Sequence, residues 1–237
     1  ITPGFGSSAL GGWAGDLEIL GSVDSRAFVY DPRGGYSLTA QVLLSGTVRD
    51  DGAFFLGARG GFRASVIVPV GLLNAFYFGV GGGFSVGPSL DADRVGLGGR
   101  NALRGFANGE LLGSGVLYGV VEHRWTAVSD LSINMLHLVW VREMQLAWWV
   151  GGGVVFDTPS RVSSFERSDV AIGTTIPGET AHGALEAGVG VRFHYEYGGI
   201  QPGVLALDFG VPISRYWESA NSTRAPIGFY VGFDQYF

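Results

Sequence analysis

The 237-residue chain contains no cysteine, and charged residues make up only 15% of it. Without cysteine there is no disulfide framework and no thiolate metal site. No uninterrupted apolar stretch of about 18 residues occurs, which argues against a membrane protein built from helices. The net charge of −6 argues against nucleic acid as a partner. No basic and apolar leader opens the chain, so we expect that a signal peptide has been removed or that an upstream domain precedes Ile1.

Hydrophobic residues are abundant instead: they form 46% of the sequence, alongside 41 glycines, and the mean hydropathy is positive. For a soluble domain of this length such a composition is unusual, so something other than water is expected to cover the surface. Without long apolar helices, a closed barrel is the structure that satisfies every backbone polar group in lipid. We predict an all-β fold in which residues 1–237 form a single domain, a closed antiparallel transmembrane β-barrel of about 8–10 strands.

Alternation of apolar and polar residues is the strongest sign of strands. In residues 181–196 every charged side chain falls on one face, and in 204–213 Asp208 shares a face with small residues, while Pro212 marks the expected end of pairing. A soluble β-sandwich alternates as well. The runs here are about 10–17 residues long, which suits tilted strands that cross a bilayer better than ordinary globular strands. Aromatic residues near strand ends could form interfacial girdles, as at Tyr30, Tyr36, Trp125, Trp140, Trp148, Trp149, Tyr195 and Tyr236.

Nine strands are expected from these patterns, at 15–30, 35–48, 53–69, 75–87, 112–125, 143–156, 181–196, 204–213 and 227–237. Single-chain bacterial barrels usually have an even number. A short strand within 1–13 would make ten, whereas leaving out 15–30 would make eight. Arg49–Gly52 and Gly198–Gly199 are expected as tight turns, and 131–142 as a structured periplasmic connection. The long polar segments are 88–111, 157–180 and 214–226.

A motif in the first long segment narrows the family. Leu103-Arg104-Gly105-Phe106 resembles the L-R-G-F/Y motif of the BamA/TamA superfamily of outer-membrane assembly and secretion barrels, also described as bacterial surface antigen barrels. In that superfamily the motif lies in an extracellular loop that folds back into the barrel, and five strands follow it to the C-terminus. Five predicted strands follow it here. The resemblance implies that all three long segments are extracellular and that the loop near 88–111 enters the lumen.

Further matches to this superfamily occur in the strands after the motif, and the resemblance covers roughly 75–237. They are Glu122-His123-Arg124, Trp149 to Gly153, Gly188 to Arg192, Leu207-Asp208-Phe209 and Gly232 to Phe237. The last of these implies a C-terminal assembly signal that contains Phe233, Gln235 and Phe237. Sixteen strands and periplasmic POTRA domains, which superfamily members carry, do not fit into 237 residues. The chain therefore resembles a short member, or the C-terminal part of one, without POTRA domains.

One departure from the family pattern concerns the loop arginine. Where the family has an inward aspartate that helps to hold this arginine, the chain has Gly151. A guanidinium inside a barrel needs several acceptors, because burying it unpaired is costly. Glu122 and Glu186 face the lumen by alternation, so we expect Arg104 to pair with one or both. The alternative is that Arg104 lies in solvent at a loop tip.

Enzyme motifs are weak. The four histidines, His123, His137, His182 and His194, are scattered, and no Gly-x-Ser-x-Gly or His-Glu-x-x-His pattern occurs. His182, Glu186, Arg192, His194 and Glu196 share a face, but a polar barrel interior gathers such residues without catalysis. The glycine runs 81–83 and 151–153 are not followed by a helix, as a phosphate loop would be. We predict no catalytic, cofactor or metal residues and no enzyme.

The resemblance leads to a hypothesis about location and activity. It implies a protein of the bacterial outer membrane that handles outer-membrane proteins or lipids through the barrel wall or seam, with membrane lipids and the outer-membrane assembly machinery as partners. A plugged barrel with a structural role, or one that pairs with a second copy as a homodimer, is the alternative. An outer-membrane hydrolase or a small-solute pore is the third hypothesis.

Overall fold

The computed structural model describes residues 2–7, 12–26, 33–49, 52, 54–87, 94–135, 137–156, 181–214 and 227–233. Within these residues the protein is all-β, as predicted, and every strand pair is antiparallel. The same part of the chain holds no helix of the length and apolarity needed to cross a membrane.

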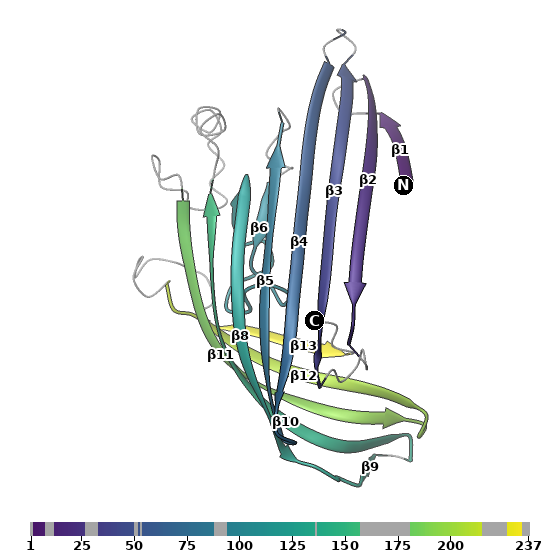
Figure 1. The fold of residues 1–237 in the computed structure, drawn as a ribbon, viewed down its shortest axis with the longest axis vertical. Coiled ribbons are helices and arrows are strands. Elements are labelled where there is room, and N and C mark those ends of the chain that lie inside the picture. Colours follow the sequence, from purple (N-terminus) through teal and green to yellow (C-terminus); the bar gives the residue numbers. More distant parts are fainter. Residues whose placement is uncertain are drawn as a thin grey trace.

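One large sheet contains most strands, and its path runs β1-β2-β3-β4-β5-β8-β10-β11-β12-β13, with β9 paired to one end of β10. Neighbours in the path are neighbours in sequence apart from the short strands after β5 and β8, so the sheet is an up-and-down meander (Figure 1). A second, two-stranded sheet consists of β6 and β7. The strands are β1 Thr2–Ser7, β2 Gly12–Asp24, β3 Gly35–Arg49, β4 Phe54–Val70, β5 Asn74–Val86, β6 Val95–Leu97, β7 Leu111–Gly113, β8 Gly115–Val128, β9 Ile133–Met135, β10 Val139–Phe156, β11 Ala181–Tyr197, β12 Gln201–Pro212 and β13 Gly228–Phe233.

Each of the nine predicted strands has a counterpart, and β1 supplies the tenth within 1–13. The main differences lie around 131–142. This segment was expected to be a connection, but β9 pairs with Val139–Val141, so β10 starts at Val139 rather than at 143. A β-bulge between Val141 and Glu143 shifts the alternation there, which hides the strand from a period-two pattern. The segment 157–180 and most of 214–226 lie outside the described residues.

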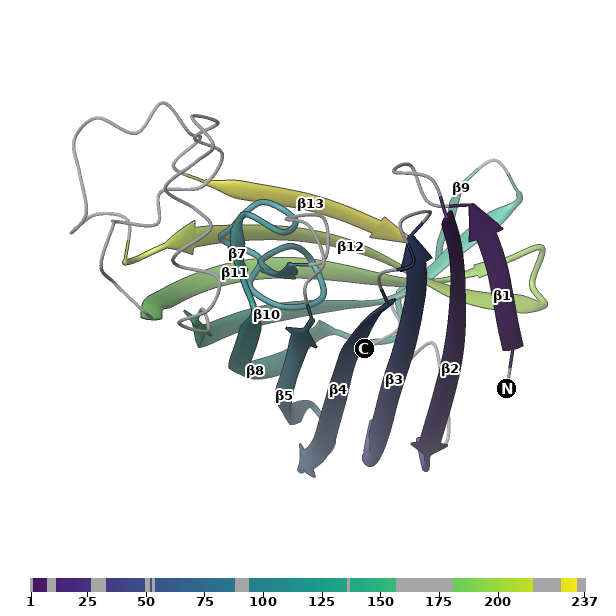
Figure 2. The same cartoon turned by 90° about the horizontal axis from the view of Figure 1, so that it is seen from above.

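The main sheet is strongly curved. Strands β1 to β5 stand roughly upright, whereas β10 and β11 bend away at their lower ends and β12 and β13 run across the view (Figure 1). Seen from above, the sheet wraps around the segment that carries β7, which lies on its concave side (Figure 2).

The predicted closure into a barrel is not present. In the described part of the chain, β1 pairs only with β2 and β13 only with β12, so the sheet is open at both edges. The error has a physical origin: alternation reports which face of a strand is apolar, but it does not report whether the two edge strands meet. The predicted count of 8–10 strands in a closed ring is replaced by an open sheet of 11 strands, including the three-residue β9.

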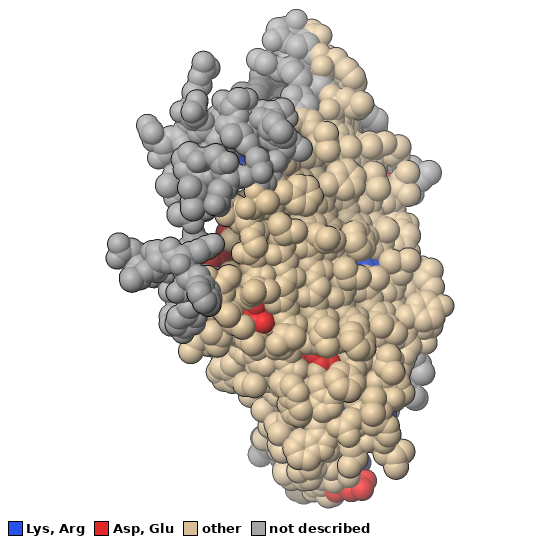
Figure 3. Space-filling view, turned by 60° about the vertical axis from the view of Figure 1, so that its left-hand side comes forward, with Lys and Arg blue, Asp and Glu red and all other residues tan. Residues whose placement is uncertain are grey.

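The convex face is predominantly apolar, which the strand registers show directly. Few atoms of Lys, Arg, Asp or Glu are visible on the side of the molecule that Figure 3 shows. One register row crosses six strands through Val66, Phe78, Val121, Val150, Ala187 and Val211. The next row crosses seven strands through Val68, Phe76, His123, Trp148, Val189, Phe209 and Phe229. Many of these side chains are exposed, Val150 and Val189 to 59%. On β3, β4, β5, β8, β11, β12 and β13 no position on this face carries a charge.

Candidate functional site

The segment between β5 and β8 packs against the concave face and carries the predicted loop motif. Strands β6 and β7 hold its two ends together, and Gly99, at φ +96°, lets the chain turn sharply between them. The Gly99 N–H lies 3.0 Å from both the Leu103 and the Phe106 carbonyl oxygens. These bonds close the motif into a compact loop. Hereafter, residues 98–110 are called the inner loop.

Two apolar side chains of the motif anchor the inner loop to the sheet. Leu103 is fully buried and Phe106 is 2% exposed. They belong to one apolar cluster with strand residues, which contains Val95, Leu97, Leu103, Phe106, Val116, Val120, Trp149, Val155 and Ala184. Burying each of the two side chains contributes about 1.5–3 kcal/mol to holding the loop in place.

Arg104 lies inside the protein and not in solvent at a loop tip, since only 4% of it is exposed. Its Nη2 lies 2.6 Å from Glu122 Oε2, and its Nη1 lies 3.4 Å from Asp208 Oδ2. The guanidinium also lies over the Trp149 ring, 4.3 Å from its centroid. Burial alone would lower the pKa of Arg104, but the charges of Glu122, Asp208 and Glu186 outweigh burial and raise it above the ordinary value. Arg104 therefore remains a cation.

Glu122 is the centre of a larger charge network. Besides Arg104, it contacts Arg124 at 2.7 Å through Oε1 and Arg192 at 2.9 Å through the same oxygen. Arg192 in turn lies 3.6 Å from Asp208. The network joins the inner loop to β8, β11 and β12, and all of its members are buried. Such a network is costly to break from one side, because the partner left behind is a buried charge without compensation.

Glu186, the second expected partner, holds the loop in another way. Its Oε2 accepts the backbone N–H of Gly105, and its Oε1 accepts the indole N–H of Trp149 at 3.1 Å. The Glu186 side chain is 1% exposed. The two expected carboxylates thus bind different parts of the motif. Glu122 contacts the Arg104 side chain, and Glu186 accepts a hydrogen bond from the backbone of the next residue, Gly105.

Glycines on the sheet make room for the inner loop. A Cβ at Gly151 would lie 3.0 Å from Glu186 Oε1 and 3.1 Å from Leu103 Cδ2. Leu103 and Glu186 therefore fill the space into which the family's aspartate would extend. On β12, a Cβ at Gly210 would lie 2.6 Å from the Gly105 backbone nitrogen. Only glycine allows the two backbones to approach this closely.

Further contacts to the inner loop come from residues that sequence reasoning did not assign to the site. The Tyr230 hydroxyl donates to the Phe106 carbonyl oxygen at 2.6 Å, which ties the loop to β13. On the other side, Arg63 Nη2 donates to the Asn101 carbonyl oxygen at 2.6 Å. Asp208 was recognised as facing inward, but its partnership with Arg104 and Arg192 needed the three-dimensional register of β11 and β12. For Arg63, Asp208 and Tyr230, the sequence offered a single signal, which is that alternation places each of them on the inward face of its strand.

The remaining predicted residues are not brought together into one site. Phe233 ends β13, whereas Gln235 and Phe237 lie outside the described residues. His123 lies on the convex face, where its ring contacts those of Phe76 and Trp148 at centroid distances of 4.7 and 4.5 Å. In the described part of the chain, no group of three His, Asp or Glu side chains is arranged to hold a metal ion.

No protein-family model matches the sequence, and no curated protein matches it either.

Proposed function

We propose that the chain is a protein of the bacterial outer membrane, similar to the BamA/TamA superfamily, whose open sheet forms a barrel wall when its two edges pair with partner strands and whose convex face lies in lipid. The observation that carries the proposal is the outward face of the meander, which has no charge on β3, β4, β5, β8, β11, β12 and β13 and continues in register across them. Apolar area of this extent is unfavourable in water. Polar residues and ion pairs lie on the opposite face, which is the arrangement typical of barrels that cross a membrane.

The open edges suggest how such a sheet acts. An unpaired strand edge in a bilayer leaves backbone N–H and C=O groups without partners, so it favours pairing with another strand. Edges β1 and β13 are the sites for that pairing. We infer that the protein handles outer-membrane proteins or lipids at this seam, with membrane lipids and the assembly machinery as partners. The inner loop stabilises the β8 to β13 side of the seam from within through Arg104 and Tyr230.

Reconstitution tests this activity. The protein is inserted into lipid vesicles, and two rates are measured: the folding of a separate small barrel added from urea, and the flip-flop of a fluorescent lipid. We expect at least one rate to exceed that of empty vesicles. A matched control uses Val231→Pro, which removes a backbone N–H from β13 and disturbs the seam, while its side chain stays on the outward face. Rates equal to those of empty vesicles for the wild-type protein would contradict the proposal.

The same free edges favour a second candidate, a plugged barrel that associates with another copy. Because the chain has no cysteine, a Val231→Cys variant carries one thiol, on β13. Oxidation in bilayers should give a disulfide-linked dimer if two β13 edges pair. Planar-bilayer recordings add a second test, since large, stable conductance would exclude the plugged barrel.

A further inference from the structure

The free edge of β13 presents an uninterrupted row of backbone groups. In an antiparallel ladder, the N–H and C=O groups of successive residues point to opposite neighbours. Directly after β12, the Ile213 N–H donates to the Leu185 carbonyl oxygen at 2.8 Å, so the odd-numbered residues of β12 bond to β11 and the even-numbered ones bond to β13. The pairing of β12 with β13 keeps this register along the described length of β13. The backbone groups that point to the free edge of β13 are therefore those of Phe229, Val231 and Phe233.

The free edge of β1 is interrupted by a proline. The Ser25 N–H donates to the Tyr36 carbonyl oxygen at 2.9 Å, so the odd-numbered residues of β2 bond to β3 and the even-numbered ones bond to β1. By the same alternation, the backbone groups that point to the free edge of β1 are those of Pro3, Phe5 and Ser7. Proline has no N–H, and on an edge strand it hinders further pairing. Of the two edges, β13 is thus the better suited to an added strand.

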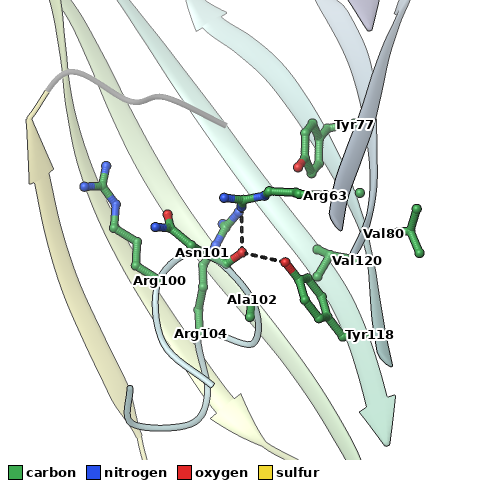
Figure 4. A pocket seen from close by; sticks show the side chains of 10 residues that line it. Arg63, Tyr77, Val80, Arg100, Asn101, Ala102, Arg104, Tyr118 and Val120 are labelled. Carbon is green, nitrogen blue, oxygen red and sulfur yellow. Dashed lines mark hydrogen bonds between the residues drawn. The ribbon is translucent and has the colours of Figure 1, made fainter. Parts of the chain in front are cut away.

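The inner loop places a cation on the concave side of this edge. The Arg100 guanidinium lies against Gly232, where the Cβ of any other residue would overlap it. In Figure 4 the Arg100 side chain points away from Arg63. Arg104 has its carboxylates, but the half-buried Arg100 has no ion pair and no side-chain hydrogen bond with any residue that the structure describes. A cation without a counter-charge therefore lies beside the edge of β13.

We propose that the free edge of β13 pairs with a strand of another polypeptide that carries an Asp or Glu on its inward face, opposite Gly232. This rests on the proposed function, because pairing at the seam is its premise. Side chains directly opposite each other on paired strands have Cβ atoms about 4.5–5.5 Å apart, so a carboxylate in this position is within reach of Arg100. The outward positions of the added strand are apolar, since Phe229 and Val231 are exposed on the convex face beside it.

Desolvation explains why the added strand needs the carboxylate. The strand covers Arg100 from the edge side and removes part of its remaining water. A neutral strand leaves a partly desolvated cation without compensation, which is costly, whereas a carboxylate accepts two N–H donors of the planar guanidinium. Strand β1 has no acidic residue in its sequence, TPGFGS, so neither this chain's β1 nor that of a second copy is the partner.

Two synthetic peptides test the proposal, with the full chain folded in an uncharged detergent. Both are short fluorescent strands that alternate apolar and polar residues, and they differ only in a central Glu or Gln on the polar face. We expect the Glu peptide to bind about tenfold more tightly, because it gains a hydrogen bond between charged groups. Arg100→Gln should abolish this preference, and Arg100→Lys, which keeps the charge, should retain part of it. Arg142→Gln is the matched control and should retain all of it, since Arg142 pairs with Glu196 away from β13.

Cross-linking identifies the edge that the peptides occupy. Each peptide carries one cysteine at an outward position, and the chain, which has none of its own, receives one by Val231→Cys on β13 or by Phe5→Cys on β1. We expect the higher yield of disulfide with Val231→Cys, and a higher yield with Phe5→Cys would overturn the proposal. Equal affinity of the wild-type protein for the two peptides would overturn it as well, but would leave pairing at the seam intact. If neither peptide bound, the proposal and the seam of the proposed function would both be wrong.

Discussion

At the scale of single residues, the inner loop is held by charge, by apolar burial and by close backbone approach. Arg104 has two carboxylates within 3.4 Å, and Leu103 and Phe106 lie in the apolar cluster beside it. The three kinds of contact act on four consecutive residues. The motif therefore anchors the inner loop to strands β8 to β12. Two substitutions test the charge and the close packing of this anchor separately.

The first substitution removes the charge. Arg104→Ala leaves Glu122 and Asp208 buried with fewer compensating charges, so we expect a loss of about 3–5 kcal/mol in the free energy of unfolding. Expression should persist, but the folded protein should lose its resistance to heat on gels, and the urea midpoint should fall. Arg142→Ala, which breaks the exposed pair with Glu196, should change stability by less than about 1 kcal/mol. Equal urea midpoints for the two variants would mean that Arg104 is not an anchor.

The second substitution removes space. Gly210→Ala places a methyl group 2.6 Å from the Gly105 nitrogen, so the inner loop must move away from β12. We expect faster proteolysis within 98–110 and a lower melting temperature. Gly183→Ala on β11 is the control, since nothing lies within 4 Å of its added Cβ. Equal cleavage rates for the two variants would contradict the close approach of Gly210 on β12 to Gly105 in the inner loop.

At the scale of elements, the alternation of apolar and polar residues predicted most of the strands and the direction in which their side chains face. Strands such as β11 and β12 alternate cleanly, since one face is apolar and the other carries Glu186, Arg192 and Asp208. The start of β10 was missed because a bulge interrupts its period. Pairing of Arg104 with Asp208 could not be predicted, because it depends on strand register and on how deeply the loop enters. Alternation in the sequence shows which face of a strand a side chain is on, whereas the register between strands decides which side chains become its neighbours.

The two faces of β3 give a matched test. Val42 points outward and Gln41 points inward near the middle of this strand. We predict that Val42→Arg reduces the stability of the membrane-inserted protein by about 2–4 kcal/mol, because a charge is placed in lipid. Gln41→Arg should be tolerated on the polar face. Refolding into vesicles at a series of urea concentrations measures both, and equal midpoints would argue that neither face meets lipid.

At the scale of the whole molecule, the sheet combines an apolar convex face, a polar concave face and two free edges. Alternation along single strands could predict the faces, but closure depends on how curvature accumulates across the strands and on the partners of β1 and β13. This is why the expected closed ring and the observed open sheet differ while the individual strands agree. The central claim is that the convex face lies in lipid.

A nitroxide scan of β3 in bilayers tests this claim most directly, because each introduced cysteine is the only thiol in the chain. Labels are placed one at a time at positions 37 to 44, and collision rates are measured with oxygen, which concentrates in lipid, and with a water-soluble nickel chelate. The account predicts opposite period-two patterns: oxygen contact is highest at the outward positions Leu38, Ala40, Val42 and Leu44, and nickel contact is highest at the inward positions between them. Nickel contact at the outward positions as high as at the inward ones would contradict it.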